Sequence, residues 1–232
     1  MKFTTTLTIY TTLAATALAH RREYLPRCST DSALPCACPA GTDYWESSTW
    51  SVIGATANDV KDLIMDYYKC AWLGIVPYET RGPNNRPGVS IRTSYLPTKV
   101  GTYSITEKLT DLKIDSRGGF IEKFEQLAST VPVEYDSGNG SFSGYWVTLE
   151  STYIFKYETA IRWSIYACET GHARSIIYPI THATEYGDML MLFFNADFAV
   201  FHENALKNAS SVLAAQGKIK GINLQPYSVQ NF

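Results

Sequence analysis

The chain has 232 residues, of which 45% are hydrophobic and 13% aromatic, and its formal net charge at pH 7 is -2. This length and composition predict one globular domain with a sizeable core. The near-neutral charge and the lack of a basic block make nucleic acids and anionic membrane surfaces poor candidate partners.

The N-terminal segment has the pattern of a secretory signal peptide. Lys2 supplies a positive start, Leu7–Leu18 is a short apolar stretch, and Ala17-Leu18-Ala19 fits the small-residue cleavage rule. The apolar stretch is too short for a membrane span, and no later segment is long and apolar enough to be one. We therefore expect residues 1–19 to be removed and the protein to be secreted or held in the secretory pathway.

Residues 20–43 contain prolines and cysteines without periodicity, which predicts an N-terminal arm outside the core. The arm holds Cys28, Cys36 and Cys38. In an oxidising compartment these residues favour a disulfide that fixes the arm to itself or to the body. The chain has five cysteines, so at least one is free or pairs between chains. No metal site is expected, because no second pair of ligands lies at metal-binding spacing.

Residues 44–217 predict one α+β domain that begins with a strand and a short helix. Tyr44–Ile53 is the expected first strand. Thr56–Tyr68 is the expected helix, because its start resembles a capping box with Asp59 and its apolar residues recur on one helical face. A further helical turn is expected over Cys70–Ile75.

A run of strands follows, and it leads to one strongly apolar helix from about Gly187 to Gly217. The expected strands are Val89–Tyr95, Thr102–Leu109, Gly119–Leu127, Gly144–Glu158, Ala160–Glu169 and Ala173–Thr184. In the fourth of these, alternation places on one face Tyr145, Val147, Leu149, Tyr153, Phe155 and Tyr157. Asp197 interrupts the apolar stripe of the helix, and residues 218–232 are left as a C-terminal tail.

These elements predict a curved antiparallel sheet of six to seven strands wrapped around a long C-terminal helix, with short helices after the first strand. Such a layout leaves an apolar space between the sheet and the helix. This space suits a small organic molecule better than a protein, a nucleic acid or a metal. Two N-glycosylation sequons, at Asn139 and Asn208, agree with a secreted glycoprotein.

Two short motifs, Gly88-Val-Ser-Ile-Arg92 and Thr106-Glu-Lys-Leu109, resemble the START-like or Bet v 1-like (SRPBCC) helix-grip superfamily. The resemblance is to its polyketide cyclase/dehydrase-like branch and to the abscisic-acid-receptor type. There a small residue and an Arg lie on the strand after the first helices, and Glu-x-Leu on the next strand precedes an Asp-containing turn, here Asp111–Asp115. The resemblance covers residues 44–217 and implies a helix-grip fold around a hydrophobic ligand, with no cofactor. With its signal peptide and sequons, the chain looks like a secreted fungal-type member linked to secondary metabolism.

Glu107 is the most pointed candidate for chemistry. Alternation places it with Tyr103, Ile105 and Leu109 on the apolar face, so it is expected to point into the cavity. In the similar family the matching Glu contributes to ligand or water contacts. Two interpretations stay open: burial makes Glu107 a proton shuttle, or it pairs with a cation such as Arg92 and holds the sheet together.

Two residues of the last predicted helix are further candidates. Asp197 is expected to face the sheet, where it meets a partner or the ligand, unless it rotates towards solvent. His202, next to Phe201, either reaches the cavity or faces solvent. The candidate catalytic residues are thus Glu107, His202 and Tyr103. The candidate substrate-binding residues are Arg92, Phe124, Tyr145, Tyr153, Trp163, Phe193, Phe194 and Asp197.

The leading hypothesis is a cofactor-independent cyclase, an isomerase or dehydratase that acts on a hydrophobic polyketide- or terpenoid-like intermediate. Aldol closure, dehydration and pericyclic closure are all compatible with it, because a pocket that holds a reactive chain in one conformer assists each of them. The alternative is a non-enzymatic carrier or sensor of a small hydrophobic ligand. A third hypothesis is a secreted interaction protein whose interior is only packed core.

Overall fold

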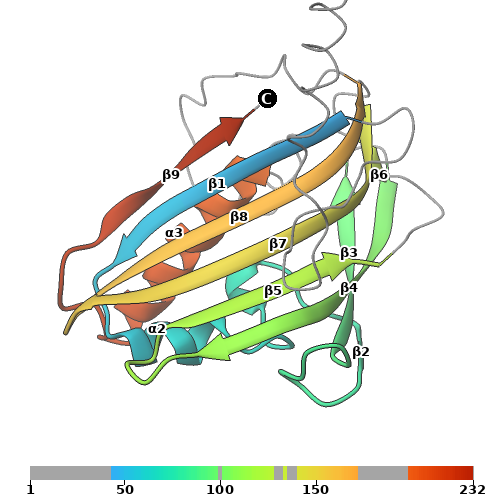
Figure 1. Ribbon diagram of the computed structural model, residues 1–232. Helices are drawn as coiled ribbons and strands as arrows, with labels where there is room; N and C mark the ends of the chain where they lie inside the picture. Colours follow the sequence, from blue (N-terminus) through green and yellow to red (C-terminus); the bar gives the residue numbers. More distant parts are fainter. Residues whose placement is uncertain (1–42, 99–100, 128–132, 135–139, 172–197, 232) are drawn as a thin grey trace, which may run out of the picture.

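A computed structural model describes residues 43–98, 101–127, 133–134, 140–171 and 198–231 (Figure 1). In these residues the strands are β1 (Asp43–Ile53), β2 (Glu79–Arg81), β3 (Ile91–Thr98), β4 (Gly101–Ile114), β5 (Phe120–Gln126), β6 (Val133–Glu134), β7 (Gly140–Phe155), β8 (Glu158–Gly171) and β9 (Leu224–Asn231). The helices are α2 (Ala57–Ile64), the short 3-10 helix η1 (Ala71–Leu73) and α3 (Phe198–Ala215).

The described strands form one antiparallel sheet in the order β2-β3-β4-β5-β7-β8-β1-β9, and β6 pairs with β7 outside this order. The sheet curves, and α2, η1 and α3 lie together on one side of it (Figure 1). Helix α3 packs against η1, β1, β9 and α2. The core lies between the inner face of the sheet and these helices.

Helix α2 starts at the predicted cap and ends earlier than predicted. The Thr56 hydroxyl accepts a hydrogen bond from the Asp59 N–H at 3.1 Å, which satisfies one free donor of the first turn. The helix ends at Ile64 rather than Tyr68. The Asp66 carboxylate accepts hydrogen bonds from the N–H groups of Tyr68 at 3.2 Å and Lys69 at 3.1 Å, which offers the backbone an alternative to helix.

Helix α3 corresponds to the second part of the predicted terminal helix, and residues 187–197 of that prediction lie outside the described residues. Its C-terminal end is closed by Gly217, whose φ of 69° is left-handed. The N–H of Gly217 donates to Ala214 O and that of Lys218 donates to Leu213 O, both at 2.9 Å. These bonds satisfy carbonyls that the end of a helix leaves without partners.

The registers of the sheet align inner-face residues from distant parts of the chain. Glu122 of β5 lies opposite Leu149 of β7, and Leu149 lies opposite Trp163 of β8. Closer to the other end of the sheet, Arg92 of β3 lies opposite Glu107 of β4, and Glu107 lies opposite Gln126 of β5. Each of these rows therefore crosses three adjacent strands.

The sheet has nine strands in the described residues, not six to seven. Strands β2 and β6 are too short to show alternation. β9 lies in the segment predicted as a tail and pairs with β1, although it contains Pro226. A proline is tolerated there because β9 is an edge strand, where one row of N–H groups has no partner in the sheet.

Two further local predictions were wrong. β4 continues to Ile114, so the turn after it is Asp115–Gly119 rather than Asp111–Asp115. The Asp115 carboxylate closes this turn by accepting the N–H groups of Arg117 at 2.7 Å and Gly119 at 3.0 Å. Phe155 is 65% exposed instead of sharing the apolar face, because the register of β7 shifts between Tyr153 and Phe155.

Several predictions lie wholly or partly outside the described residues. These are the signal peptide, the arm with its three cysteines, the strand Ala173–Thr184 and the sequon at Asn139. In the described part, Cys70 is free and buried. Asn208, which begins the other sequon, lies within α3 and donates from Nδ2 to Trp72 O at 2.8 Å, so its amide is already engaged. No helix of the described residues is long and apolar enough to cross a membrane.

Candidate functional site

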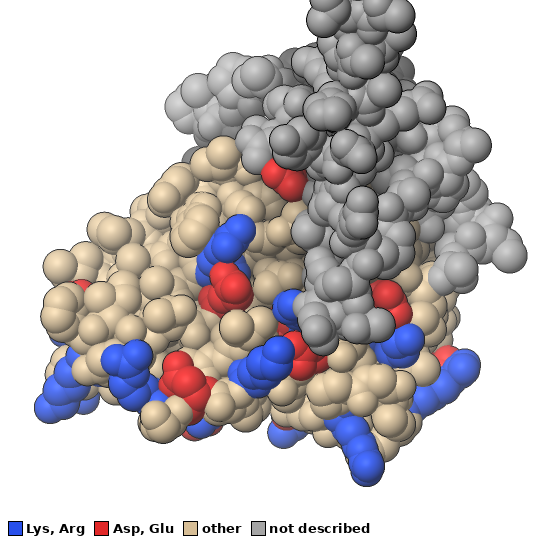
Figure 2. All heavy atoms as spheres, in the orientation of Figure 1, with Lys and Arg blue, Asp and Glu red and all other residues tan. Residues whose placement is uncertain are grey.

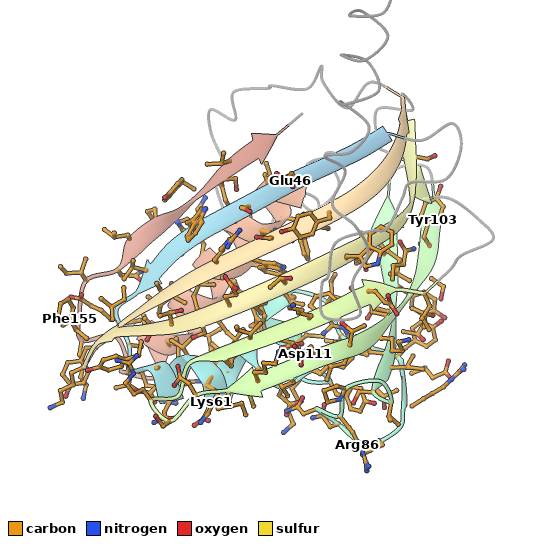
Figure 3. The ribbon with its side chains drawn as sticks, viewed as in Figure 1. Glu46, Lys61, Arg86, Tyr103, Asp111 and Phe155 are labelled. Carbon is orange, nitrogen blue, oxygen red and sulfur yellow. The ribbon has the colours of Figure 1, made fainter. Side chains whose placement is uncertain are left out.

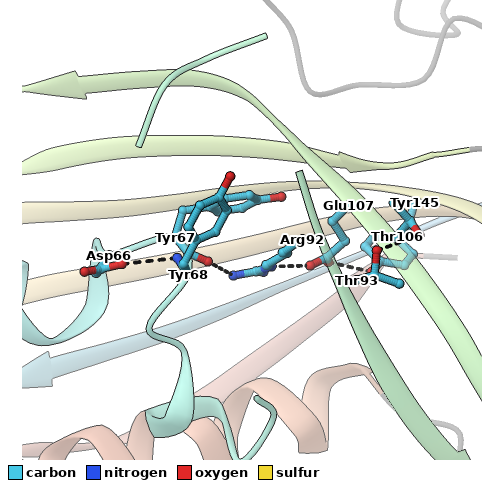
Figure 4. A network of polar contacts seen from close by, with 8 residues as sticks. All are labelled: Asp66, Tyr67, Tyr68, Arg92, Thr93, Thr106, Glu107 and Tyr145. Atoms are coloured by element: carbon cyan, nitrogen blue, oxygen red, sulfur yellow. Dashed lines mark hydrogen bonds and ion pairs between the residues drawn. The ribbon is translucent and has the colours of Figure 1, made fainter. Parts of the chain in front are cut away.

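A hydrogen-bonded polar network lies on the inner face of β3, β4 and β7 (Figure 4). Arg92 Nε donates to Glu107 Oε2 at 2.6 Å, and the Tyr145 hydroxyl donates to Glu107 Oε1 at 2.5 Å. Arg92 Nη1 also donates to the backbone carbonyl of Tyr67 at 2.9 Å. We call Arg92, Glu107, Tyr145 and Tyr67 the Arg92 network.

The chain before β3 fixes the position of Arg92. Gly88 adopts a φ of 77°, which favours glycine, and its N–H donates to Leu109 O at 2.8 Å. The Ser90 hydroxyl donates to Pro83 O at 2.6 Å and accepts from the Arg86 N–H at 2.7 Å. The loop that leads into β3 is thus tied down, and the register of β3 on β4 sets Arg92 opposite Glu107.

The sequence left open whether Glu107 is a proton shuttle or pairs with a cation such as Arg92. The structure shows the ion pair with Arg92. Both carboxylate oxygens of Glu107 accept hydrogen bonds, so this side chain holds Arg92 and Tyr145 in place. The Arg92 guanidinium lies over the rings of Tyr67 at 4.3 Å and Phe124 at 4.9 Å. Burial, reinforced by Glu107, raises the pKa of Tyr145 well above its usual value, so Tyr145 stays a neutral donor.

Glu122 is the functional candidate that the sequence reading missed. It is 3% exposed, and in the part of the chain that the structure describes its Oε2 has no hydrogen-bond partner. Burial raises the pKa of Glu122 to about 8; the nearby Glu107 adds to the rise and Arg92 opposes it. A signal was present in the sequence, because alternation from Phe120 and Phe124 places Glu122 on the inner face of β5.

Two other buried polar atoms near Phe124 lack hydrogen-bond partners among the described residues: the Tyr67 hydroxyl and Gln126 Oε1. Tyr67 packs against Phe124 with ring centroids 5.9 Å apart, and Gln126 follows Phe124 on the inner face of β5. Burial holds the pKa of Tyr67 far above its usual value, so its hydroxyl remains a donor. Buried polar atoms normally meet a protein group, water or a ligand. This part of the interior is therefore suited to receive a polar group of a small molecule.

A second cluster surrounds Trp163 of β8. The ring of His202 from α3 stacks on Trp163 at 3.9 Å with an interplanar angle of 13°. The ring centroid of Trp72 in η1 lies 5.5 Å from that of Trp163, and the ring centroid of Phe201 in α3 lies 6.0 Å from it. Burial lowers the pKa of His202 to about 3, so its imidazole is neutral at pH 7.

The structure brings together some of the predicted site residues and separates others. Arg92, Glu107, Phe124 and Tyr145 lie together, and Trp163 lies against His202. Tyr103 is half-buried and packs at the edge of the core, and it lies at the opposite end of the sheet from Phe155 (Figure 3).

Tyr153 does not lie with the Arg92 network. It is eight residues from Tyr145 along β7, a separation of roughly 27 Å at about 3.4 Å per residue. The guanidinium of Arg117 lies over its ring at 5.1 Å. Phe193, Phe194 and Asp197 lie outside the described residues.

The visible face in Figure 2 shows Lys and Arg intermixed with Asp and Glu rather than one patch of a single sign. Among the described residues, no group of three His, Cys, Asp or Glu side chains is placed to hold a metal ion.

A family model described as a START domain matches residues 44–190. A search of curated protein sequences finds no match. Among solved structures, truncated norcoclaurine synthase from Thalictrum flavum is similar, with a TM-score of 0.47 and 11% identity over 76% of this chain and 98% of that chain. Zhui aromatase/cyclase from Streptomyces sp. R1128 is similar with a TM-score of 0.47 and 10% identity over 78% of this chain and 100% of that chain. A protein from Thermobifida fusca has a TM-score of 0.38 and 17% identity over 52% of this chain and 71% of that chain.

Proposed function

The chain belongs to the START domain family, and from this premise we propose that it is a cofactor-independent cyclase for a hydrophobic polyketide- or terpenoid-like intermediate. START-like domains bind small hydrophobic ligands, and the described interior is lined by apolar and aromatic side chains. The observation that carries the proposal is Glu122: a carboxyl group buried in an apolar wall, with one oxygen that has no hydrogen-bond partner among the described residues.

The reaction that best uses this carboxyl group is an intramolecular aldol closure. The Glu122 carboxylate takes a proton from a carbon next to a ligand carbonyl, and an enolate forms. The enolate carbon attacks a second carbonyl of the same chain, so one C–C bond forms as one C=O π bond opens. The new alkoxide then takes the proton back from Glu122, and the enzyme returns to its starting state.

The pKa of Glu122 supports its role as a base. With a pKa of about 8, about a tenth of the protein carries an ionised Glu122 at pH 7. A base with this pKa removes a carbon-bound proton more effectively than an ordinary carboxylate, because its affinity for the proton is higher. Burial thus lowers the fraction of Glu122 that is ionised at pH 7 and makes the ionised form a stronger base.

Tyr67 and the apolar wall supply the rest of the proposed chemistry. The Tyr67 hydroxyl donates a hydrogen bond to the oxygen on which the enolate charge develops. Arg92 binds the Tyr67 carbonyl and is itself held by Glu107, so the Arg92 network positions this donor. Phe120 and Phe124, on either side of Glu122 along β5, restrict the reactive chain to folded conformers.

The second candidate function is a carrier or sensor of a small hydrophobic ligand. The Tyr67 hydroxyl and Gln126 Oε1 favour it, because these buried atoms lack hydrogen-bond partners among the described residues and can bind a ligand without any chemical step. In a carrier, Glu122, Tyr67 and Gln126 would only bind polar groups of the ligand.

The test uses an extract from the source organism after deletion of the gene, in which the substrate accumulates. The purified protein and its Glu122→Gln variant are added, and the products are followed by liquid chromatography with mass spectrometry. Glu125→Gln is the matched control, because Glu125 is on the opposite face of β5 and pairs with Lys108 at 3.0 Å.

We expect the wild-type protein and Glu125→Gln to convert one accumulated compound to an isomer, or to a species lighter by one water. Glu122→Gln should lose conversion by a factor of about 10²–10⁴, the usual contribution of a general base. Retention of a compound without a change of mass or elution would instead make the protein a carrier. If the protein neither converts nor retains any compound of the extract, both candidates are contradicted.

A further inference from the structure

We propose that Trp72, Trp163 and His202 form a second hydrogen-bonding subsite, which takes a hydroxyl group at the far end of the ligand. This inference rests on the proposed function in one respect, namely that a ligand lies along the inner face of the sheet. It adds a substrate class: elongated hydrophobic molecules that carry a hydroxyl group remote from the reacting carbonyls.

Three buried polar atoms in this cluster have no hydrogen-bond partner among the described residues. They are Trp72 Nε1, Trp163 Nε1 and His202 Nδ1. Their side chains come from η1, β8 and α3, and the exposed fractions are 4%, 2% and 1%. A buried polar atom without a partner costs free energy, and three in one ring cluster indicate that another molecule supplies the missing bonds.

The number and type of these atoms match a hydroxyl group. Each indole Nε1–H is a donor only. The neutral imidazole of His202 offers one acceptor nitrogen, and this is Nδ1 in the tautomer that carries its proton on Nε2. A hydroxyl oxygen accepts two hydrogen bonds and donates one. The number and type of its bonds therefore match the three atoms, whereas a carbonyl oxygen would leave Nδ1 unpaired in this tautomer.

The sheet register gives the distance between the two subsites. Glu122, Leu149 and Trp163 lie in one row across β5, β7 and β8. Two steps between neighbouring strands separate the backbones of Glu122 and Trp163 by about 10 Å. Leu149 lies between them and is buried, so the middle of the row is apolar. A ligand that contacts both ends has polar groups roughly 10 Å apart on an apolar body.

Two rigid probes of the same size test this inference. The first is 4,4′-dihydroxybiphenyl, with one hydroxyl at each end. The second is 4-hydroxy-4′-methylbiphenyl, in which a methyl group replaces one hydroxyl. Their affinities are measured by isothermal titration calorimetry for the wild-type protein and for Trp163→Phe, which keeps a ring but removes the N–H. Trp50→Phe is the control, because Trp50 is partly exposed under the guanidinium of Arg162.

We expect the wild-type protein and Trp50→Phe to bind the dihydroxy probe more than about tenfold more tightly than the methyl probe, because three hydrogen bonds are at stake and each is worth about five- to tenfold. In Trp163→Phe the ratio should fall by about five- to tenfold, the value of the one bond lost, with the affinity for the methyl probe retained. Trp72→Phe should lower the ratio as well, which provides a second reading if Trp163→Phe fails to fold.

Equal affinities in the wild-type protein would overturn the inference, and they are the result expected if a structural water satisfies the three atoms. An affinity ratio that is unchanged in Trp163→Phe and in Trp72→Phe would also overturn the inference. So would failure of both probes to bind the wild-type protein. The cyclase proposal is judged separately by the conversion of the extract. Conversion without hydroxyl preference removes only the subsite, and hydroxyl preference without conversion removes only the cyclase.

Discussion

Replacing Glu122 by Gln should remove a loss of stability that the wild-type protein suffers as the pH rises from acid to neutral. Burial raises the pKa of Glu122 from 4.5 to about 8. Below pH 4.5 the carboxyl group is protonated in the folded and unfolded states alike. As the pH rises from 4.5 to 8 the unfolded chain ionises first, so the free energy of unfolding falls, and above pH 8 it levels off. Gln keeps the size of Glu and does not titrate.

The expected gain follows from the size of the shift. One pKa unit corresponds to 1.36 kcal/mol, so the 2.5 units between 4.5 and pH 7 give about 3 kcal/mol. The free energy of unfolding of Glu122→Gln minus that of the wild-type protein should therefore rise by about 3 kcal/mol between pH 4 and pH 7. The cost of burying the amide is the same at every pH, so it cancels from this change.

The assay is urea unfolding followed by circular dichroism at half-unit steps from pH 4 to pH 9. Glu125→Gln, which removes a partly exposed carboxylate on the opposite face of β5, is the control. A constant difference for Glu122→Gln would refute the reasoning, because it would mean that Glu122 titrates alike in the folded and unfolded states.

Three further predictions concern the ion pair, the buried histidine and the N-terminus. Glu107→Gln should lower the free energy of unfolding by about 3–5 kcal/mol, because it leaves the buried Arg92 guanidinium without its counter-charge; Glu79→Gln, in the exposed pair with Arg81, should cost less than about 1 kcal/mol. Equal losses in thermal melts would show that burial of the Arg92 pair has no effect. His202 has a pKa lowered from 6.5 to about 3, so the unfolded chain is protonated first as the pH falls below 6.5 and stability is lost down to about pH 3. His202→Phe should lack that part of the acid loss, about 3 kcal/mol at pH 4, and an unchanged acid transition would be evidence against a neutral buried imidazole. Finally, N-terminal sequencing of the protein expressed in a eukaryotic secretory host should begin after residue 19, and an intact N-terminus would contradict the predicted signal peptide.

The inner positions of Glu107 and Tyr145 could be predicted from the sequence because both residues obey strand alternation. Glu107 shares its face with Leu109, and Tyr145 shares its face with Val147, so both inner positions followed from the pattern. The choice between a proton shuttle and an ion pair could not be made in this way. It depends on the register between β3 and β4, which brings Arg92 opposite Glu107.

Glu122 was missed because charged residues occur on both faces of β5. Lys123 and Glu125 point outward while Glu122 and Gln126 point inward, so polarity alone does not mark the buried face. The contact of His202 with Trp163 depends on how α3 lies across the sheet, which no periodicity reveals. β9 was missed because Pro226 argues against a strand unless the strand is known to lie at an edge.

In the proposed reaction Glu122, in its ionised form, is the base of a ring closure. The most direct measurement is the turnover number as a function of pH, for the wild-type protein and Glu122→Gln, with the substrate isolated from the extract. We expect a wild-type rate that rises with pH and is half-maximal near pH 8, and a Glu122→Gln rate that is lower by about 10²–10⁴ and lacks this rise. A Glu122→Gln variant with wild-type turnover and the same pH profile would contradict this role of Glu122.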